Sequence, residues 1–474
     1  MLKLMDLKKL TIRKVTAFSI LAVILALAAL VRFYQIDSNV YMGGDEGRDA
    51  QVTEQMIETH KPILQGPPTS IVTDIGRVYY GPGYYYVNIP FFLLTGGNPD
   101  SAYIATALFG FLATVLMFLV AKDLFGWKAG LVSAALYAVS VHMVSFERWA
   151  WSPNWIPFFS LLAVYGLIQL TRGKSWGAYL LAVAFAVGWQ LHYTFLFLLI
   201  AVAAIVWRFK VRIDRKTTLL SLATFLVLSS PLIINDFKYG FPNLKTALYY
   251  LFIQNKGHLA FSDKLQAVGG GTLKIIQNTL GTLGVISWLL AGLSLVALAF
   301  ETVRDRGSLA TYLLILWPIV AIVPVLLMYN GDIPFDERFV MSLLPWVFVM
   351  IGLAVRKFEA LSAVEMAVLT LTLIVFMTSV RSFGLLDGSF FSHQPTGLAN
   401  MEKAVDYMYT KTSDHKINFD YHPSGGTYPA GYLYIMKWLG LSVGSGSKTF
   451  SLYERDPGGI QGARFGPILV VEKI

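Results

Sequence analysis

The sequence predicts an α-helical protein that crosses a membrane about eleven times and ends in a small α+β domain outside the cytoplasm. Three observations predict this architecture. The composition is too apolar for a soluble protein, the apolar residues fall into runs of membrane-spanning length, and the last part of the chain changes to mixed helical and strand patterns between Gly- and Pro-rich turns.

The composition places much of the surface in lipid. Of the 474 residues, 55% are apolar and 14% are charged, whereas soluble domains carry about 25% charged residues. A soluble chain of this length could not enclose so much apolar surface. The net charge is +9, but the basic residues lie in short runs between apolar segments, which is typical of loops beside anionic lipid and argues against nucleic acid as a partner. The absence of Cys excludes disulfides and thiolate metal sites.

A helix needs about 20 residues to cross the hydrocarbon core. The stretch from Trp176 to Trp207 is too long for one crossing, so we divide it at Gln190–Tyr193. The first apolar run, Val15–Val31, follows a basic stretch and contains Ala26-Leu27-Ala28, so it is either an uncleaved first helix, which its length favours, or a signal peptide. The candidate spans are 15–33, 101–121, 129–146, 155–171, 176–191, 193–208, 217–235, 280–300, 309–328, 339–355 and 359–380.

The distribution of Lys and Arg sets the expected orientation. Basic runs at the N-terminus, 122–128, 172–174, 208–216, 304–306 and 356–357 all fall on one side, which the positive-inside rule makes the cytoplasm. The sequence thus predicts a multi-pass protein of the plasma membrane with a cytoplasmic N-terminus. Residues 1–380 form the transmembrane domain with outer loops 34–100 and 236–279, and residues 381–474 form an extracytoplasmic α+β domain, with a helix at Asn400–Tyr409 and strands at Lys416–Tyr421, Lys448–Tyr453 and Pro467–Val471.

The first outer loop carries paired acids. Gly43-Gly44 precede Asp45, Glu46 and Arg48, and a helical pattern runs on to about Thr59. Carboxylates are favoured at a helix N-terminus. The pattern therefore indicates either the cap of an amphipathic interfacial helix or a pair of acids that perform chemistry.

An aromatic segment follows in the same loop. Five tyrosines, including Tyr84, Tyr85 and Tyr86, flank the Gly81-Pro82-Gly83 turn, and Arg77 lies just before them. The tyrosines form either a belt at the lipid head groups or a platform for a lipid-linked or sugar-bearing ligand. Arg77 could offer its guanidinium to a phosphate.

Three further polar groups fall on the same predicted face. Arg148 stands out because the short outer loops hold almost no basic residues, and it either snorkels to the surface or pairs with a phosphate or Asp45. His192-Tyr193 marks another outer turn, for which a simple polar helix end is the plainer interpretation. The third group is Asp332, Asp336, Glu337 and Arg338, before the apolar run from Phe339. Their shared side is the strongest functional signal in the sequence.

These motifs resemble those of the GT-C membrane glycosyltransferases, especially the family-39 and family-83 branch that includes protein O-mannosyltransferases and lipid A aminoarabinose transferases. Asp45-Glu46-Gly47-Arg48-Asp49-Ala50 is similar to the branch's Asp-Glu-x-Arg-x-Ala element, and Gly81–Tyr86 to its Gly-Pro element followed by aromatics. Glu337-Arg338-Phe339 with Leu344-Pro345 is similar to its Arg-aromatic and Leu-Pro segment. The chain departs from the pattern at Asn154, which follows Ser152-Pro153 where relatives often carry an acid.

The resemblance implies a polyprenyl-phosphate sugar as donor and transfer to an acceptor hydroxyl at the outer membrane face. Asp45 would act as the base of a single inverting displacement, which is worth about 10²–10⁴ in rate, and Glu46 and Arg48 would position it. Arg148 and Arg338 would neutralise the departing phosphate, and Tyr84–Tyr86 would line the donor's path.

Other features stay open in the sequence. A divalent cation could be held by Asp45 and Glu46. The acceptor could be a glycan, a lipid or a protein. The alternative functions are a transporter or flippase of lipid-linked sugars, and a polysaccharide polymerase or ligase that uses a lipid-diphosphate donor. A flippase would more often carry charges at mid-membrane.

Overall fold

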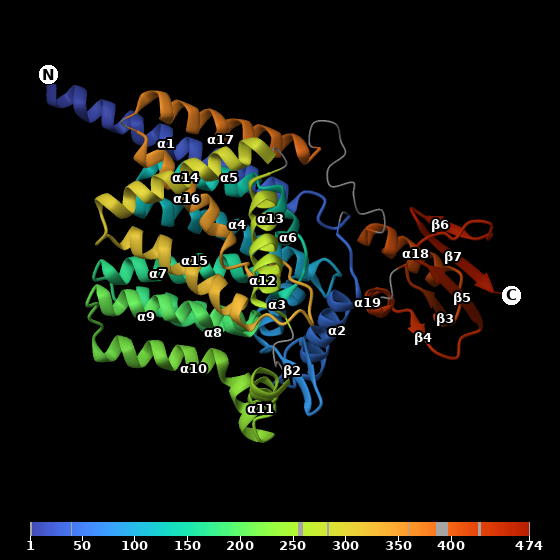
Figure 1. Ribbon diagram of the computed structural model, residues 1–474. Coiled ribbons are helices and arrows are strands. Elements are labelled where there is room, and N and C mark those ends of the chain that lie inside the picture. The colour runs from blue at the N-terminus through green and yellow to red at the C-terminus, as the bar shows by residue number, and fades with distance from the viewer. Residues whose placement is uncertain are drawn as a thin grey trace.

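The computed structural model describes residues 2–38, 40–254, 259–281, 284–359, 361–384, 397–424 and 428–473, with side chains from Val15 onward. Most of this part of the chain is helical, and strands lie in one hairpin and in one small sheet near the C-terminus (Figure 1). The main helices of the bundle are α1 (Leu2–Phe33), α4 (Ser101–Phe125), α5 (Trp127–Val139), α7 (Ile156–Thr171), α8 (Gly177–Leu191), α9 (Leu198–Arg208), α10 (Arg215–Lys238), α14 (Gly284–Arg304), α15 (Leu309–Met328), α16 (Leu344–Lys357) and α17 (Ser362–Ser382).

Each of the eleven predicted spans overlaps a helix in the described residues, but 129–146 is divided between α5 and α6, and fewer than eleven helices are long enough to cross a membrane by themselves. Within the described residues, seven helices meet that length and composition, or eight if α5 and α6 (Val141–Glu147), which meet at an angle of 63°, form one span. The remaining segments are shortened by polar or Pro residues at their outer ends. Helix α8 stops at Leu191 before His192, and α16 begins at Leu344-Pro345 because Pro is suited to the first turn of a helix.

The bundle has a dense centre and an apolar outside. Helices α4, α5, α7 and α16 pack against one another in the largest buried cluster. By contrast, α10 and α17 bury only 17% and 22% of their apolar windows. Exposed Leu and Val on these outer helices are expected where lipid is the solvent. The chain is a multi-pass membrane protein.

The elements that carry the predicted polar groups gather at one end of the bundle (Figure 1). There α2 (Gly44–Thr59), the hairpin of β1 (Pro68–Thr73) and β2 (Gly76–Tyr79), and α3 (Gly83–Thr95) follow α1. The three-residue helix η5 (Glu337–Phe339) precedes α16 at this end. The other elements here are α6, α11 (Pro242–Tyr249), η3 (Tyr250–Gln254), α12 (Phe261–Lys264), η4 (Leu265–Gly270) and α13 (Gly271–Leu280).

The C-terminal domain holds a five-stranded mixed sheet of order β4-β3-β5-β7-β6, in which β3 pairs parallel with β4 and β5. The predicted helix and the three predicted strands are confirmed as α18 (Leu398–Thr410), β3 (Lys416–His422), β5 (Lys448–Tyr453) and β7 (Ile468–Lys473). The sequence did not indicate α19 (Ala430–Trp438), β4 (Ser442–Val443) or β6 (Ala463–Phe465). The predicted domain boundary at 380/381 falls just before residues 385–396, which lie outside the described part.

Helix α19 of this domain lies directly on α2. A Cβ atom added at Gly47 would come within 2.2 Å of the Ala430 carbonyl carbon and the Gly431 nitrogen, so the two backbones touch. Gln51 donates to the Ala430 carbonyl at 2.9 Å, and Lys437 pairs with Glu54 at 2.9 Å. The C-terminal domain is therefore fixed against the helix that begins with the paired acids.

Candidate active site

A large open cavity lies beside the contact between the membrane bundle and the C-terminal domain. Its volume is about 1290 Å³, and both parts of the chain line it. Asp45, Arg48 and Arg77 come from the first outer loop, and Tyr428 comes from the segment before α19. We call it the acceptor cavity, after the role that the resemblance of its motifs implies for it. A space of this size, open to water and lined by acids, arginines and aromatic rings, can admit a large polar substrate.

Asp45 lies on this cavity at the second residue of α2. Its carboxylate is 57% exposed and accepts a hydrogen bond from Arg48 Nη1 at 2.6 Å. Arg48 also binds the buried Asp49 at 2.7 Å, and Tyr85 donates its hydroxyl to Asp49 at 3.1 Å. Burial raises the pKa of Asp49 to about 7, against the opposing effect of Arg48. Asp49 thus holds the Arg48 guanidinium in place, and Arg48 in turn keeps the Asp45 carboxylate directed at the cavity.

Glu46 has a structural position beside Asp45. Its Oε2 accepts from the Gly43 N–H at 2.9 Å, so Glu46 satisfies the N–H of the residue that precedes α2. Its Oε1 accepts from the Trp149 indole N–H. Burial raises the pKa of Glu46, although the Trp149 hydrogen bond opposes this. Both oxygens are engaged, so Glu46 orients the first turn of α2 and leaves Asp45 as the accessible acid.

This arrangement does not fit the divalent cation considered from the sequence. Glu46 uses both oxygens for N–H donors, and the oxygen of Asp45 faces the cation of Arg48. Among the described residues, no group of three or more His, Asp or Glu side chains is arranged to hold a metal ion. We derive no step through a metal here.

A second, smaller cavity of about 160 Å³ lies between the β1–β2 hairpin, the turn after α8 and the end of α15. Its lining is mainly aromatic and aliphatic, and among the described residues that form it, Arg338 carries the positive charge. We call it the donor cavity, after the phosphate-binding role that the resemblance implies for Arg338. His192, Tyr193 and Tyr80 also line it, so the two predicted residues of the α8 turn do reach a cavity. Burial and the charge of Arg338 lower the pKa of His192 to about 3, which keeps the imidazole neutral.

Arg338 is held in a fixed orientation. Its Nε donates to Asp336 at 2.8 Å, and its Nη2 pairs with the same carboxylate at 2.5 Å. Burial works against the charge, but Asp336 outweighs it and the pKa of Arg338 is raised, with Asp45 adding to the effect.

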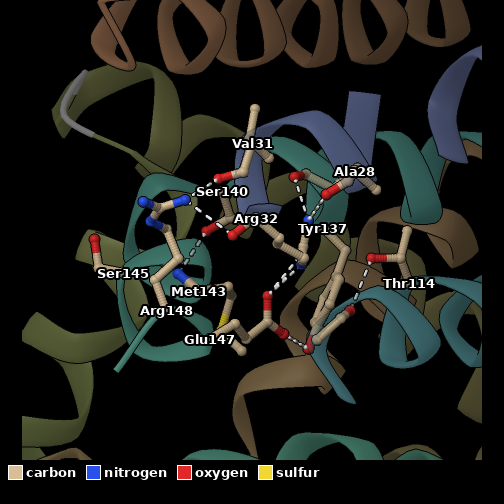
Figure 2. Close-up of polar contacts among 12 residues, drawn as sticks. Ala28, Val31, Arg32, Thr114, Tyr137, Ser140, Met143, Ser145, Glu147 and Arg148 are labelled. Carbon is tan, nitrogen blue, oxygen red and sulfur yellow. Dashed lines mark hydrogen bonds and ion pairs between the residues drawn. The ribbon is translucent and has the colours of Figure 1, made fainter. Parts of the chain in front are cut away.

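Arg148 has a different role from the one expected from the sequence. Its guanidinium donates to the backbone carbonyl of Arg32 at 2.9 Å, in the last turn of α1 (Figure 2). It also donates to the carbonyls of Tyr34 at 2.9 Å and Gln35 at 3.2 Å, just after α1. The last carbonyls of a helix lack partners within the helix, and a cation there is favoured by the helix dipole. Arg148 lines the acceptor cavity, but its guanidinium donates to carbonyls at the end of α1. The phosphate-binding role expected from the sequence is therefore corrected: Arg148 anchors the end of α1.

The tyrosine segment is also placed differently from the prediction. Tyr84 and Tyr85 are 1% and 2% exposed, and Tyr84 packs on Trp155 with ring centroids 4.6 Å apart. Tyr86 donates to the Ile63 carbonyl at 3.1 Å. None of the three lines either cavity, because the Gly81–Gly83 turn directs the first turn of α3 into the bundle, against Gln190.

The other predicted residues are dispersed. Arg77 is exposed on β2 at the rim of the acceptor cavity. Asn154 is buried and donates to the Trp149 carbonyl at 2.9 Å, so it supports a loop and does not enter the cavity. Glu337 lies 4.0 Å from His142 and lines neither cavity.

Sequence reasoning missed one buried ion pair close to the site. Arg32, at the end of α1, is 0% exposed and pairs with Glu147 at 2.5 Å. Tyr137 donates to the same carboxylate at 2.6 Å (Figure 2). The available signal was an arginine, Arg32, in the last turn of the 19-residue span Val15–Phe33, together with an acid directly before Arg148. Intramembrane charges of this kind usually have a partner.

Comparison with solved structures identifies the fold of the chain. The chain matches ArnT from Cupriavidus metallidurans bound to undecaprenyl phosphate with a TM-score of 0.56 and 12% identity, over 95% of this chain and 97% of that one. The protein has the GT-C glycosyltransferase fold. The chain also matches the Archaeoglobus fulgidus oligosaccharyltransferase, solved with Zn and sulfate, with a TM-score of 0.50 and 12% identity, over 90% of this chain and 62% of that one.

A family model agrees with the fold. Residues 80–234 match the model of the dolichyl-phosphate-mannose-protein mannosyltransferases. No curated protein matches the sequence significantly. The resemblance expected from the motifs is thus confirmed at the level of the fold.

Proposed function

We propose that this GT-C protein is an inverting glycosyltransferase that moves a sugar from a polyprenyl phosphate to an acceptor hydroxyl at the outer face of the membrane. One observation carries the proposal. An exposed carboxylate, Asp45, faces a large open cavity, while Arg338 lines a small apolar cavity and is linked to the first turn of α2 through the rings of Trp151 and Trp149. Base and phosphate-binding cation are the two groups that such a transfer needs on opposite sides of the reacting carbon.

The acceptor cavity would hold the acceptor, whose hydroxyl is the nucleophile, next to Asp45, which is the base. The acceptor hydroxyl would donate a hydrogen bond to Asp45, which takes the proton as the oxygen attacks the anomeric carbon. A new glycosidic bond forms while the bond between the anomeric carbon and the phosphate oxygen breaks. The products are the glycosylated acceptor and polyprenyl phosphate. Arg48 keeps Asp45 pointed at the cavity through the 2.6 Å hydrogen bond.

The donor cavity suits the phosphate end of the lipid. Asp336 binds the Nε and Nη2 of Arg338, and the Nη1 of Arg338 contacts Ser70 at 3.3 Å. Because Nη1 carries two N–H groups, one remains to donate to a phosphate. A guanidinium in an apolar site stabilises the charge that develops on the leaving phosphate. The aromatic and aliphatic lining would accept the first prenyl units. The undecaprenyl phosphate in the ArnT structure supports this class of donor.

The orientation in the membrane completes the proposal. The basic loops expected at the cytoplasm and the two cavities belong to opposite ends of the helices, as in α8, which runs from Gly177 near Lys174 to Leu191 beside the donor cavity. Placing the basic ends inside puts the site and the C-terminal domain outside the cytoplasm of the plasma membrane.

The test is transfer from a defined panel of donors. Purified protein is incubated with undecaprenyl phosphate esters of several radiolabelled sugars, and both the release of undecaprenyl phosphate and the label in acceptors are measured. Asp45→Asn should lower turnover by at least about a hundredfold, whereas Asp74→Asn, an exposed acid in the β1–β2 turn, should not. Movement of intact lipid-linked sugar between leaflets without release would identify a flippase instead.

A further inference from the structure

Three aromatic rings and one guanidinium form a stack between the two cavities. The rings of Phe146 and Trp149 have centroids 6.1 Å apart at 26°, and those of Trp149 and Trp151 are 4.8 Å apart at 16°. The guanidinium carbon of Arg338 lies 5.2 Å from the centre of the Trp151 ring. We call Phe146, Trp149, Trp151 and Arg338 the aromatic column.

The column joins the acid of one cavity to the cation of the other. The Trp149 indole N–H donates to Glu46, whose other oxygen caps the first turn of α2, next to Asp45. At the far end, Arg338 lines the donor cavity. A contact between a guanidinium and an aromatic face is directional, and so is a hydrogen bond. The rings of Trp149 and Trp151 therefore fix the position of Arg338 relative to the start of α2.

The backbone under the column is anchored to α1. Between Phe146 and Trp149, Glu147 pairs with the buried Arg32 and Arg148 donates to the last carbonyls of α1 (Figure 2). Asn154 then donates to the Trp149 carbonyl at 2.9 Å, which closes the loop from the other side. The loop cannot shift without breaking buried polar contacts, which is costly in a low-dielectric surrounding.

We propose that Trp149 and Trp151 are positioning residues that set the spacing between Asp45 and Arg338. The inference rests on the proposed function. In an in-line displacement, the base beside the acceptor oxygen and the cation beside the leaving phosphate must face opposite sides of one anomeric carbon. A misplacement of about 1 Å can lower the rate about 10²-fold. The column acts on Asp45 through Glu46, and directly on Arg338.

The two rings can be tested separately. Trp151→Ala removes the face that supports Arg338, so turnover should fall about 30- to 100-fold while the Kd for undecaprenyl phosphate changes by less than about fivefold, because Asp336 still holds the guanidinium. Trp151→Phe keeps an aromatic face and should retain turnover within about fivefold of wild type. Trp149→Phe keeps a ring but loses the N–H donor to Glu46, and should lower turnover about tenfold.

A matched arrangement at the other end of the bundle provides the control. Trp176 is 42% exposed, close to the 39% of Trp149. It packs against Tyr165 with centroids 5.9 Å apart, and Lys174 Nζ lies 6.0 Å from its ring. Trp176→Ala therefore removes a similar aromatic and cation contact, about 22 Å from the site along the 15-residue α8, and should leave turnover unchanged.

The experiment measures turnover, the Kd for undecaprenyl phosphate and thermal stability in detergent for each variant. A wild-type protein that transfers none of the sugars would refute the proposed function, not the column. If the wild type is active, turnover of Trp151→Ala equal to that of Trp176→Ala overturns the inference, as does a loss of affinity as large as the loss of turnover. Should Trp151→Ala not fold, wild-type turnover of Trp149→Phe overturns it.

Discussion

Replacing Gly47 with Ala tests whether the C-terminal domain sets the position of Asp45. Gly47 lies in the first turn of α2, where the backbone of α19 touches it. Helix α2 carries Asp45, and α19 belongs to the C-terminal domain. A single methyl group at this point therefore perturbs the distance between the two elements without removing any polar group.

The size of the effect follows from the geometry. The new Cβ would lie 2.2 Å from the Ala430 carbonyl carbon and the Gly431 nitrogen, whereas nonbonded carbon atoms prefer about 3.5–4.0 Å. These are backbone atoms and cannot rotate away, so α2 and α19 must separate by about 1 Å or more. Overpacking of this kind costs about 1–3 kcal/mol. A displacement of about 1 Å at Asp45 should lower turnover about 10²-fold.

The assay compares Gly47→Ala with Gly292→Ala. Gly292 lies in α14, and a Cβ there would meet nothing within 4 Å. Turnover with the best lipid-linked donor and thermal stability in detergent are measured for both. Gly292→Ala should keep its activity and be as stable as wild type or more so, since Ala favours helix by about 1 kcal/mol. Wild-type turnover in Gly47→Ala would refute the claim that α19 positions Asp45.

Three further predictions concern buried charges. Burial raises the pKa of Asp49 to about 7, so the native state binds more protons than the unfolded state and the protein loses stability as the pH rises from about 4 to about 7. Asp49→Asn should remove this loss, so its free energy of unfolding relative to wild type, measured by denaturant titration at each pH, should rise over that window by at most about 4 kcal/mol; a constant difference would contradict this. Glu147→Gln leaves Arg32 buried and unpaired, and should destabilise the protein by about 3–5 kcal/mol in denaturant titration; a change under 1 kcal/mol, about the value of an exposed pair, would exclude a buried ion pair. Arg338→Lys loses the planar group that Asp336 binds, and should weaken undecaprenyl phosphate binding about tenfold, by direct titration; unchanged affinity would remove Arg338 from the donor site.

The sequence was most informative where a pattern is local. Apolar runs located every helix of the bundle, and alternating patterns located three strands of the C-terminal sheet. The pairing of Asp45 with Arg48 follows from their spacing of three residues on one helix. The shared side of the motifs, more than any single motif, predicted that the segments of Asp45 and Arg338 lie near each other, and contacts from Glu46 through Trp149 and Trp151 to Arg338 join these segments.

Contacts between distant segments were beyond the sequence. Arg148 looked like a phosphate ligand because its partners are backbone carbonyls at the end of α1, and no residue type marks them. Tyr84 and Tyr85 looked like a surface platform because their burial depends on how the Gly-Pro-Gly turn meets Gln190. The aromatic column joins the loop after α6 to Glu46 and Arg338, more than 100 residues away on either side.

The proposed transfer requires Asp45 and Arg338 to act on the two sides of one bond. The most direct measurement is a cryo-EM structure of Asp45→Asn with a lipid-linked sugar that the wild type consumes. We expect the phosphate in contact with the Arg338 guanidinium and the sugar between it and residue 45, with its anomeric carbon facing the acceptor cavity. A phosphate bound at Arg148, or at the opposite end of the bundle, would contradict the account.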